Sequence, residues 1–298
     1  MKKKTDINSL KFQIVILLVF VVEGVTLAGS YSFLTVVRSN NSKYDEWCSD
    51  EIAVFENSYR DKYYKIQSIM AACGYNENMQ RLLSGAEESA YEILTPIDNM
   101  EKNLLLMMYN YTELDDSLLD VYIKDKSNRL FSYTIYHNDE KLYKFMEESS
   151  GDNSENVSDI FEIGNFSCFA IAEPIRKFEE KGTKFSLSEN KIIGTSIFTV
   201  KTDFMMQNIK RISHKSSRVY LLDKNGNIML EPEGQEPLEG NLAKAIRNWE
   251  IGAEKMSTMV TEGYAFNGKL INSNGWKLVV ITPERERNFY DVSAFGWL

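Results

Sequence analysis

The sequence predicts an α+β protein in which one N-terminal transmembrane helix is followed by long helices and then by two antiparallel sheets. Three observations support this fold class. Residues 12–37 are almost entirely apolar, and residues 43–73 carry apolar side chains at alternating steps of three and four. From residue 118 onward, short apolar stretches alternate with turn residues, which is typical of strands. Helices followed by a run of strands indicate an α+β arrangement.

The apolar segment 12–37 is long enough to cross a membrane, and Gln13 and Glu23 are its only strongly polar residues. A helical crossing needs roughly 20 mostly apolar residues. Four lysines lie among the first eleven residues, whereas Arg38 is the only basic residue directly after the segment. Because basic residues favour the cytoplasmic side, we expect residues 1–11 inside, an anchor in the cytoplasmic membrane and the main part outside.

A cleaved signal peptide is the alternative, since Thr26, Ala28 and Gly29 supply small residues where a peptidase could cut. The segment continues to residue 37 with membrane-compatible residues, including two aromatic residues suited to the interface. This continuation favours the uncleaved anchor.

Charge and cysteine content exclude several classes of protein. The chain has 34 basic and 43 acidic residues. Four of the basic residues and one of the acidic residues lie among the first eleven, so residues 12–298 carry a formal charge of −12. An acidic surface disfavours nucleic acid as a partner. Cys48, Cys73 and Cys168 form no Cys-x-x-Cys pair, so neither a zinc site nor a disulfide scaffold is expected. A continuous helix would separate Cys48 from Cys73 by about 37 Å, too far for a disulfide.

Residues 43–73 are predicted to form one long amphipathic helix that leaves the membrane and ends at Gly74. Its apolar stripe has two interpretations: it packs on the domain that follows, or it forms the seam of a homodimer. Shorter helices are predicted at 76–84 and 86–111. The stripe consists of Cys48, Ile52, Phe55, Tyr59, Tyr63, Ile66, Met70 and Cys73.

Two groups of strands follow. In the first, 151–158 is predicted to be a polar loop and the long hairpin turns around Gly182. The strands of this group are predicted at 118–124, 129–136, 166–176 and 191–201, with helices at 140–148 and 202–213.

In the second group, Asn225-Gly226 and Asn267-Gly268 are the predicted hairpin turns, because Asn-Gly favours the tight turn that joins two strands. Pro283 ends the last strand, and a helix begins at residue 284. The strands are predicted at 218–223, 227–230, 258–266, 269–272 and 276–282, with one helix at 241–249.

No catalytic residues are predicted. His137 and His214 are the two histidines, and neither has neighbours typical of a metal site or a catalytic triad. Phosphate-binding loops, nucleophile elbows and dinucleotide-binding glycine patterns do not occur. We therefore expect no enzyme activity, no metal and no cofactor.

Several strand sequences resemble the double Cache family, whose members are PAS-like extracytoplasmic sensor domains of bacterial receptors. Within it, the chain is most similar to the sensor halves of membrane histidine kinases of Gram-positive bacteria. The segments that carry the resemblance are Leu-Asp-Val-Tyr-Ile-Lys-Asp at 119–125, Ala-Glu-Pro-Ile at 172–175, Ile-Gly-Thr-Ser-Ile at 193–197, Val-Tyr-Leu-Leu-Asp-Lys-Asn-Gly-Asn-Ile at 219–228 and Gly-Trp-Lys-Leu-Val at 275–279.

The resemblance implies a domain order along the chain. It runs through a cytoplasmic tail at 1–11, the membrane helix at 12–37, a helical stalk at 38–117, a membrane-distal PAS-like domain at 118–213, a membrane-proximal PAS-like domain at 214–283 and the start of a C-terminal helix at 284–298.

The implied function is ligand sensing for a signal-transduction receptor of the histidine-kinase type, with occupancy transmitted by repacking of helices. Such receptors continue into a second membrane helix and an output domain, and no transmitter motif occurs up to Leu298. We therefore expect either the sensory part of a longer receptor or a stand-alone anchored sensor. The Arg-Trp-Tyr-Asp pattern of amino-acid-binding members is not found, so the resemblance does not imply an amino-acid ligand.

Aromatic and cationic residues of the distal strands are the candidate ligand-binding residues. A small-molecule pocket of this kind would use Arg129, Tyr133, Tyr136, Phe169 and Arg176. The alternative is a membrane-anchored interaction protein whose distal domain binds a protein partner, such as a solute-binding protein. An apolar surface patch without an enclosed pocket would favour that alternative.

Overall fold

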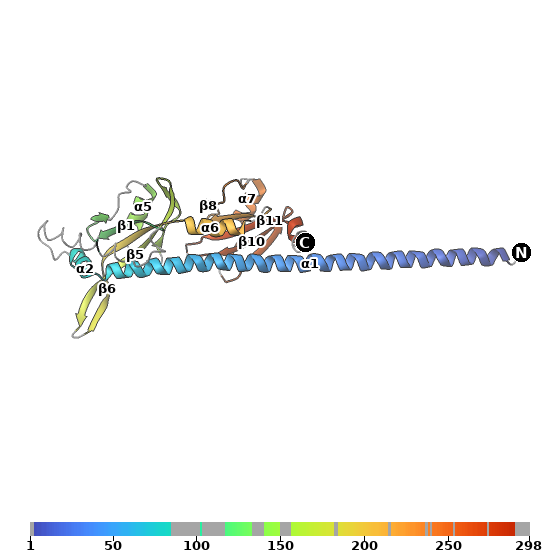
Figure 1. The fold of residues 1–298 in the computed structure, drawn as a ribbon, viewed down its shortest axis with the longest axis horizontal. Helices are drawn as coiled ribbons and strands as arrows, with labels where there is room; N and C mark the ends of the chain where they lie inside the picture. The colour runs from blue at the N-terminus through green and yellow to red at the C-terminus, as the bar shows by residue number, and fades with distance from the viewer. Residues whose placement is uncertain are drawn as a thin grey trace.

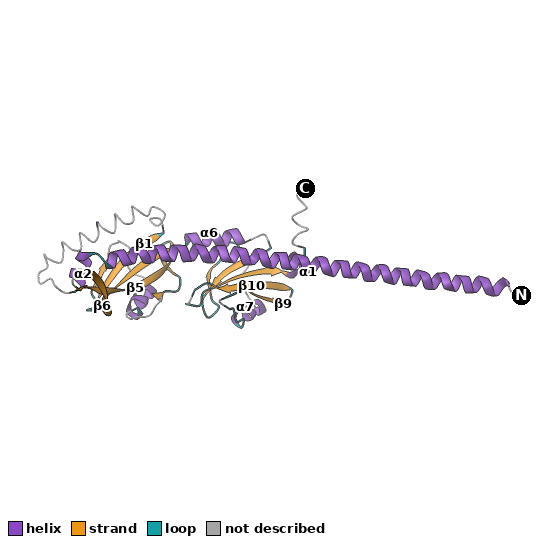
Figure 2. Cartoon of the chain, turned by 90° about the horizontal axis from the view of Figure 1, so that it is seen from below, coloured by secondary structure: helices purple, strands orange, loops and turns teal. Residues whose placement is uncertain are grey.

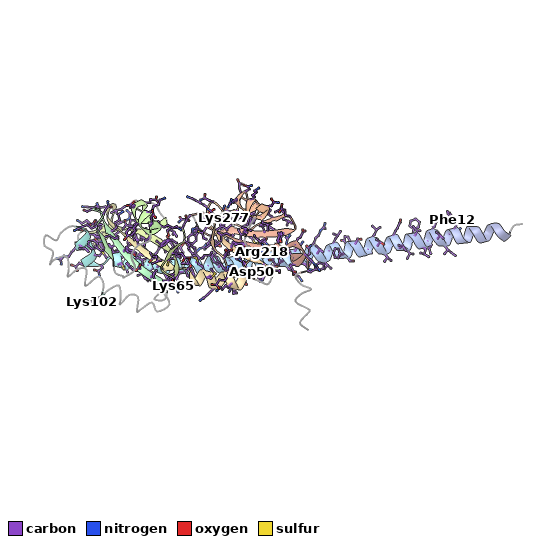
Figure 3. All side chains as sticks on the ribbon, turned by 90° about the horizontal axis from the view of Figure 1, so that it is seen from above. Phe12, Asp50, Lys65, Lys102, Arg218 and Lys277 are labelled. Atoms are coloured by element: carbon purple, nitrogen blue, oxygen red, sulfur yellow. The ribbon has the colours of Figure 1, made fainter. Side chains whose placement is uncertain are left out.

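The computed structural model describes residues 3–84, 102, 117–132, 140–149, 156–181, 184–213, 216–235, 238, 240–252, 254–272 and 274–289. Helix α1 (Lys3–Gly74) is one continuous 72-residue rod. Both sheets lie along its C-terminal half, while its N-terminal half extends away from them (Figures 1 and 2). Phe12 marks the bare part of the rod, and Asp50 lies where the rod runs beside the sheets (Figure 3).

Within the described residues, one helix is long and apolar enough to cross a membrane, and it is α1. The side chains of its apolar segment are exposed, including Leu17, Phe20 and Leu27. The predicted break at Gly74 is confirmed, since α1 ends there.

The apolar stripe of α1 packs against the sheets, so the first of its two interpretations is confirmed. All eight of its residues are at most 7% exposed, and they share one core cluster with residues of both sheets. A homodimer cannot use the same face of the helix. Cys48 and Cys73 are both free thiols, as expected from their positions on one continuous helix.

The short helices agree with the periodicity of the sequence. The predicted helix at 86–111 lies outside the described residues. The observed helices are α2 (Glu77–Leu83), α5 (Glu140–Glu148), α6 (Asp203–Ile212), α7 (Gly240–Arg247) and α8 (Glu284–Asn288).

The distal sheet, which lies farther along α1 from the membrane-spanning segment, is antiparallel with the strand order β2-β1-β6-β5-β3, and β4 also pairs with β5. Its strands are β1 (Leu118–Asp125), β2 (Leu130–Ser132), β3 (Asn156–Val157), β4 (Phe161–Ile163), β5 (Phe166–Lys181) and β6 (Lys184–Lys201).

Three features of the distal sheet differ from the prediction, and one is that the three-residue strand β4 was not predicted. The segment expected to be a polar loop ends in β3, whose two residues are too few to show alternation. Strands β5 and β6 also run past their predicted ends, pairing as far as Lys181 and Lys184 to form an arm beyond the sheet (Figure 1). The arm is rich in polar residues, so it lacks the apolar alternation from which strands are predicted.

The proximal sheet is antiparallel and has five strands, as predicted, and their order is β8-β7-β11-β10-β9. Its strands are β7 (Arg218–Leu222), β8 (Ile228–Leu230), β9 (Ser257–Thr261), β10 (Tyr264–Leu270) and β11 (Lys277–Pro283).

The predicted turn at Asn267-Gly268 is wrong. Both residues lie in the middle of β10, and the turn is at Glu262-Gly263, where φ is 52° and 76°. A Cβ on Gly268 would lie 2.9 Å from the Trp249 ring and 3.0 Å from Ile251. This glycine therefore serves close side-chain packing over the sheet, a use that the dipeptide alone does not reveal.

Each sheet is covered on both faces. Helix α1 covers one face of both sheets, and a short amphipathic helix covers the other: α5 on the distal sheet and α7 on the proximal sheet. The cores under α5 and under α7 are therefore separate from the core that both sheets share under α1.

Candidate ligand-binding cleft

The α5 face of the distal sheet carries a row of polar side chains on β1. Side chains alternate along a strand, so Asp120, Tyr122 and Lys124 point to the same face. Asp120 and Tyr122 are 1% and 3% exposed, and the Tyr122 hydroxyl donates to Asp120 Oδ2 at 2.9 Å. Burial, with the neighbouring Asp120 carboxylate adding to it, raises the pKa of Tyr122 well above its usual range, so the phenol remains a donor.

Small residues lie on β5, which is separated from β1 by β6. Cys168, Ala170 and Ala172 on β5 are at most 2% exposed and belong to the same cluster as Tyr122 and the α5 residue Met146. These short side chains are therefore buried in the core under α5.

An open cleft of about 460 Å³ lies between the β1–β2 hairpin and α5. A volume of this size suits a small molecule, for which pockets usually measure about 300–1,000 Å³. The Lys124 ammonium group donates to the Met146 carbonyl at 2.9 Å and so ties the sheet to the last turn of α5. The cleft is lined by Lys124, Asn128, Leu130, Tyr143, Met146 and Glu147.

The hairpin that forms one side of the cleft is held by Asp125. Its Oδ1 accepts from the backbone N–H groups of Ser127 at 2.8 Å and Arg129 at 2.7 Å. Its Oδ2 accepts from Arg129 Nε at 2.5 Å. Asn128 adopts a φ of 61°, a conformation that Asn tolerates better than most residues. The turn therefore holds Asn128 in a fixed position at the cleft.

The three predicted site residues that the structure describes, Arg129, Phe169 and Arg176, do not lie together. Arg129 adjoins the cleft, but its guanidinium group pairs with Asp125 and lies 5.8 Å from the Phe131 ring centroid. Phe169 is 1% exposed in the core under α1, which supports a packing role for it. Arg176 lies farther along β5, where its carbonyl accepts from Gln80. Tyr133, Tyr136, His137 and His214 lie outside the described residues.

Sequence reasoning did not find the residues that line the cleft. Lys124 was within reach, because the alternation of the predicted strand at 118–124 places it on one face with Tyr122. Tyr143 and Glu147 lie on a helix whose position over the sheet no local pattern specifies. Among the described residues, no group of three His, Cys, Asp or Glu side chains is placed to hold a metal ion.

No protein-family model and no curated protein sequence matches the chain. Solved structures do match, and all of those compared share few identical residues with it. The ligand-binding domain of the Campylobacter jejuni chemoreceptor Tlp3, in complex with 4-methylisoleucine, is 13% identical with a TM-score of 0.56, over 85% of this chain and 94% of that one.

Two further structures agree. The extracellular domain of the putative histidine kinase vpHK1S-Z8 is 10% identical with a TM-score of 0.53, over 85% of this chain and 96% of that one. The ligand-binding domain of the Pseudomonas aeruginosa amino-acid chemoreceptor PctC, in complex with GABA, is 8% identical with a TM-score of 0.54, over 80% of this chain and 98% of that one. With its two antiparallel sheets along one long helix, the chain has the fold of these sensory domains, the double Cache fold.

Proposed function

We propose that this chain is the extracytoplasmic ligand-sensing module of a bacterial membrane receptor of the histidine-kinase type. One observation supports this most directly: the cleft on the α5 face of the distal sheet, in a fold shared with ligand-binding sensory domains. Residues 12–37 anchor the chain in the cytoplasmic membrane with the N-terminus inside. The sheets then lie on the outer side.

In this proposal the chain divides by role. Residues 118–213 form the membrane-distal domain that binds ligand, residues 214–283 form the membrane-proximal domain, and α1 runs along both. A ligand in the cleft favours one packing of the sheets on α1, and the shift in population is transmitted toward the membrane.

The lining of the cleft supports a small polar ligand. Lys124 offers an ammonium group, Glu147 a carboxylate, Asn128 an amide and Tyr143 a phenol, with Leu130 among the apolar walls. The relatives of known structure hold 4-methylisoleucine and GABA, which each carry an ammonium group and a carboxylate. Tyr133 and Tyr136 follow β2 in the sequence and remain candidates on that ground alone.

A thermal-shift screen of the full chain in nanodiscs tests the proposal, using sugars, amino acids, carboxylates and nucleobases. A ligand that binds only the folded state stabilises it by RT ln(1 + [L]/Kd), about 2.7 kcal/mol at 100 times Kd. We expect a saturable rise in Tm with one class of compound. Tyr143→Ala and Lys124→Met should remove the rise, whereas Tyr64→Ala, which removes an exposed tyrosine of α1, should keep it.

A protein partner is the second candidate, and the arm of β5 and β6 supports it. The paired strands continue beyond Arg176 to Lys181 and Lys184, away from the sheet (Figure 1). A chain that melts cooperatively and shifts with no compound would contradict the small-molecule proposal. Binding of a solute-binding protein that is lost when 178–187 is shortened would then favour the partner.

A further inference from the structure

Three aromatic rings from three different segments meet where the two sheets adjoin. Phe169 comes from β5 of the distal sheet, Trp276 from the connection between β10 and β11, directly before β11, and Tyr59 from α1. The Phe169 and Trp276 centroids are 5.5 Å apart with the rings at 82°, and Tyr59 lies 6.2 Å and 5.7 Å from them. Trp276 is fully buried and Phe169 is 1% exposed. The contact between the sheets is therefore direct and buried.

Polar contacts also hold the connection between β10 and β11, to which Trp276 belongs. Asn272 Nδ2 donates to the Tyr59 hydroxyl at 3.2 Å, and Asn272 Oδ1 accepts from the Trp276 backbone N–H at 3.1 Å. Asn274 Nδ2 donates to the carbonyl of Val157 on β3. The connection is thus bonded both to α1 and to an edge strand of the distal sheet.

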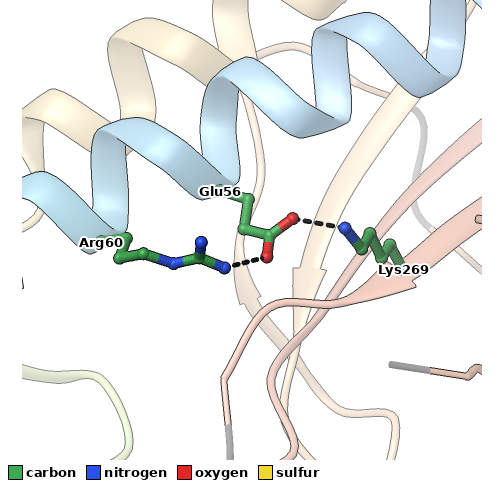
Figure 4. A network of polar contacts seen from close by, with 3 residues as sticks. All are labelled: Glu56, Arg60 and Lys269. Atoms are coloured by element: carbon green, nitrogen blue, oxygen red, sulfur yellow. Dashed lines mark hydrogen bonds and ion pairs between the residues drawn. The ribbon is translucent and has the colours of Figure 1, made fainter. Parts of the chain in front are cut away.

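One turn earlier on α1, an ion-pair network joins the helix to the end of β10. Glu56 accepts from Lys269 Nζ on one carboxylate oxygen and from Arg60 on the other, each at 2.5 Å (Figure 4). The side chains of Glu56 and Lys269 are 13% and 18% exposed, so water screens this pair weakly. The network limits sliding of α1 along the proximal sheet at the point where the rings meet.

The other end of β11 is also attached to α1. Arg287, on the short helix α8 after β11, donates to both carboxylate oxygens of Asp45, at 3.2 Å and 2.5 Å. Asn40 Nδ2 donates to the Asn288 carbonyl at 2.8 Å. Strand β11 therefore runs from the junction of the sheets to a clamp on the first turns of α1 after the membrane-spanning segment.

We propose that the connection formed by Ile271, Asn272 and residues 274–276 couples the two sheets mechanically, with Trp276 as its central contact. A shift of β3 or β5 acts on Trp276 and Asn274 directly, and β11 carries the shift to α8 and Asp45. A signal from the distal sheet therefore has two routes toward the membrane, one along α1 and one through the proximal sheet. The purpose of this coupling rests on the proposed function, but its existence is independent of any ligand.

Hydrogen exchange of the full chain in nanodiscs, measured by mass spectrometry across a urea series, tests the coupling. Peptides of β5 and β6 report on the distal sheet, and peptides of β10 and β11 on the proximal sheet. In the native chain we expect both sets to lose protection at one urea midpoint. Trp276→Leu should separate the two midpoints by about 0.5 M or more, because a shared unfolding unit becomes two.

Trp249→Leu is the matched control. Trp249 packs on Phe266 over the α7 face, away from the junction, with ring centroids 6.2 Å apart. Its loss should lower both midpoints together, because the junction stays intact. Asn274→Ala keeps all three rings and removes only the bond to Val157, so it tests the same coupling if Trp276→Leu does not fold.

Separate midpoints in the native chain would overturn the inference, and so would coincident midpoints in Trp276→Leu or, where that variant does not fold, in Asn274→Ala. The experiment contains no ligand, so its failure is distinct from failure of the compound screen. If the chain binds a compound but the two sheets unfold at independent urea midpoints, the proposed function is supported and the coupling through Trp276 is contradicted.

Discussion

The distal and proximal sheets bury one face against the same helix and differ on the other. The α5 face of the distal sheet includes the small residues Cys168, Ala170 and Ala172, and a cleft of about 460 Å³ lies between the β1–β2 hairpin and α5. The α7 face of the proximal sheet is filled by large side chains instead. They are Tyr220, Leu222, Ile246, Phe266, Val279 and Ile281, with Trp249 and Ile251 packed against them.

The two sheets therefore differ in how the face away from α1 is packed. In the proximal sheet, the missing Cβ of Gly268 lets Trp249 lie directly on the strand. In the distal sheet, the small residues are buried in the core under α5, and the cleft lies between the β1–β2 hairpin and α5. In the proposed function, the distal sheet holds the ligand and the proximal sheet transmits its effect.

The hairpins β1–β2 and β7–β8 are built alike despite this difference. Asp223 Oδ1 accepts from the N–H groups of Asn225 and Asn227, both at 2.8 Å, and Oδ2 accepts from Asn227 Nδ2 at 2.7 Å. Asp125 makes the corresponding bonds in the distal sheet. The two turns are equivalent, so what differs between the sheets lies in the faces.

The largest expected effect comes from truncation on the filled face. Phe266 is fully buried, so Phe266→Ala should lower the free energy of unfolding by about 3–5 kcal/mol through lost burial and a cavity. Leu130→Ala, at the edge of the cleft and 40% exposed, should cost less than about 1 kcal/mol. Urea unfolding of both variants measures the contrast. Equal losses would mean that the two faces are packed alike.

Alkaline pH should destabilise the chain through its cysteines. Burial raises the pKa of the Cys48, Cys73 and Cys168 thiols to about 12, from a usual value of 9.0. Above pH 9 the unfolded chain releases these protons while the folded chain keeps them. Stability is therefore full below pH 9 and falls as pH rises toward 12, by about 1.4 kcal/mol per pH unit and thiol.

Urea midpoints at pH 8 and pH 10 test this dependence. Cys168→Ala on the cleft side and Cys48→Ala under α1 should each reduce the slope by a similar amount. A slope that neither variant changes would show that the thiols are not the groups responsible.

A Cβ added at Gly268 should strain the packing of the α7 face. Gly268→Ala places a methyl group 2.9 Å from the Trp249 ring, and overpacking of this kind costs about 1–3 kcal/mol. Gly252→Ala is the control, because its nearest neighbour would be Ser257 Oγ at 4.0 Å. Equal melting temperatures for the two variants would contradict the packing role of Gly268.

Removal of either turn aspartate should have the smallest effect. Asp223→Ala and Asp125→Ala each lose three hydrogen bonds within a turn, and we expect about 1–2 kcal/mol from each. The extra charge of Arg129 adds little, because its side chain is 51% exposed. Urea unfolding should place the two variants within about 0.5 kcal/mol of each other. A larger difference would show that the hairpins are not equivalent.

Local patterns predicted most of the fold. The apolar stripe of α1 is buried as expected, and Asn225-Gly226 lies in a tight turn whose Gly226 has a φ of 81°. Such features depend on neighbours in the sequence, which propensity and periodicity report. The error at Asn267-Gly268 arose because its glycine serves a contact with Trp249, which is nineteen residues earlier in the chain and outside any local sequence window.

The candidate site was less predictable than the fold. Arg129 and Phe169 were chosen as a cation and an aromatic on distal strands, but one stabilises a turn and the other fills the core under α1. Lys124, Tyr143 and Glu147 come from a strand and a helix that only the tertiary packing brings together.

The sequence by itself determined the apolar segment, the α+β class, the long helix and most strands of the two sheets, because each depends on periodicity or on turn chemistry over a few residues. Only the tertiary structure decided where an open cleft remains and how β11 is held at both of its ends. Those features depend on the volumes of side chains that lie far apart in the chain and meet only when the sheets pack on α1.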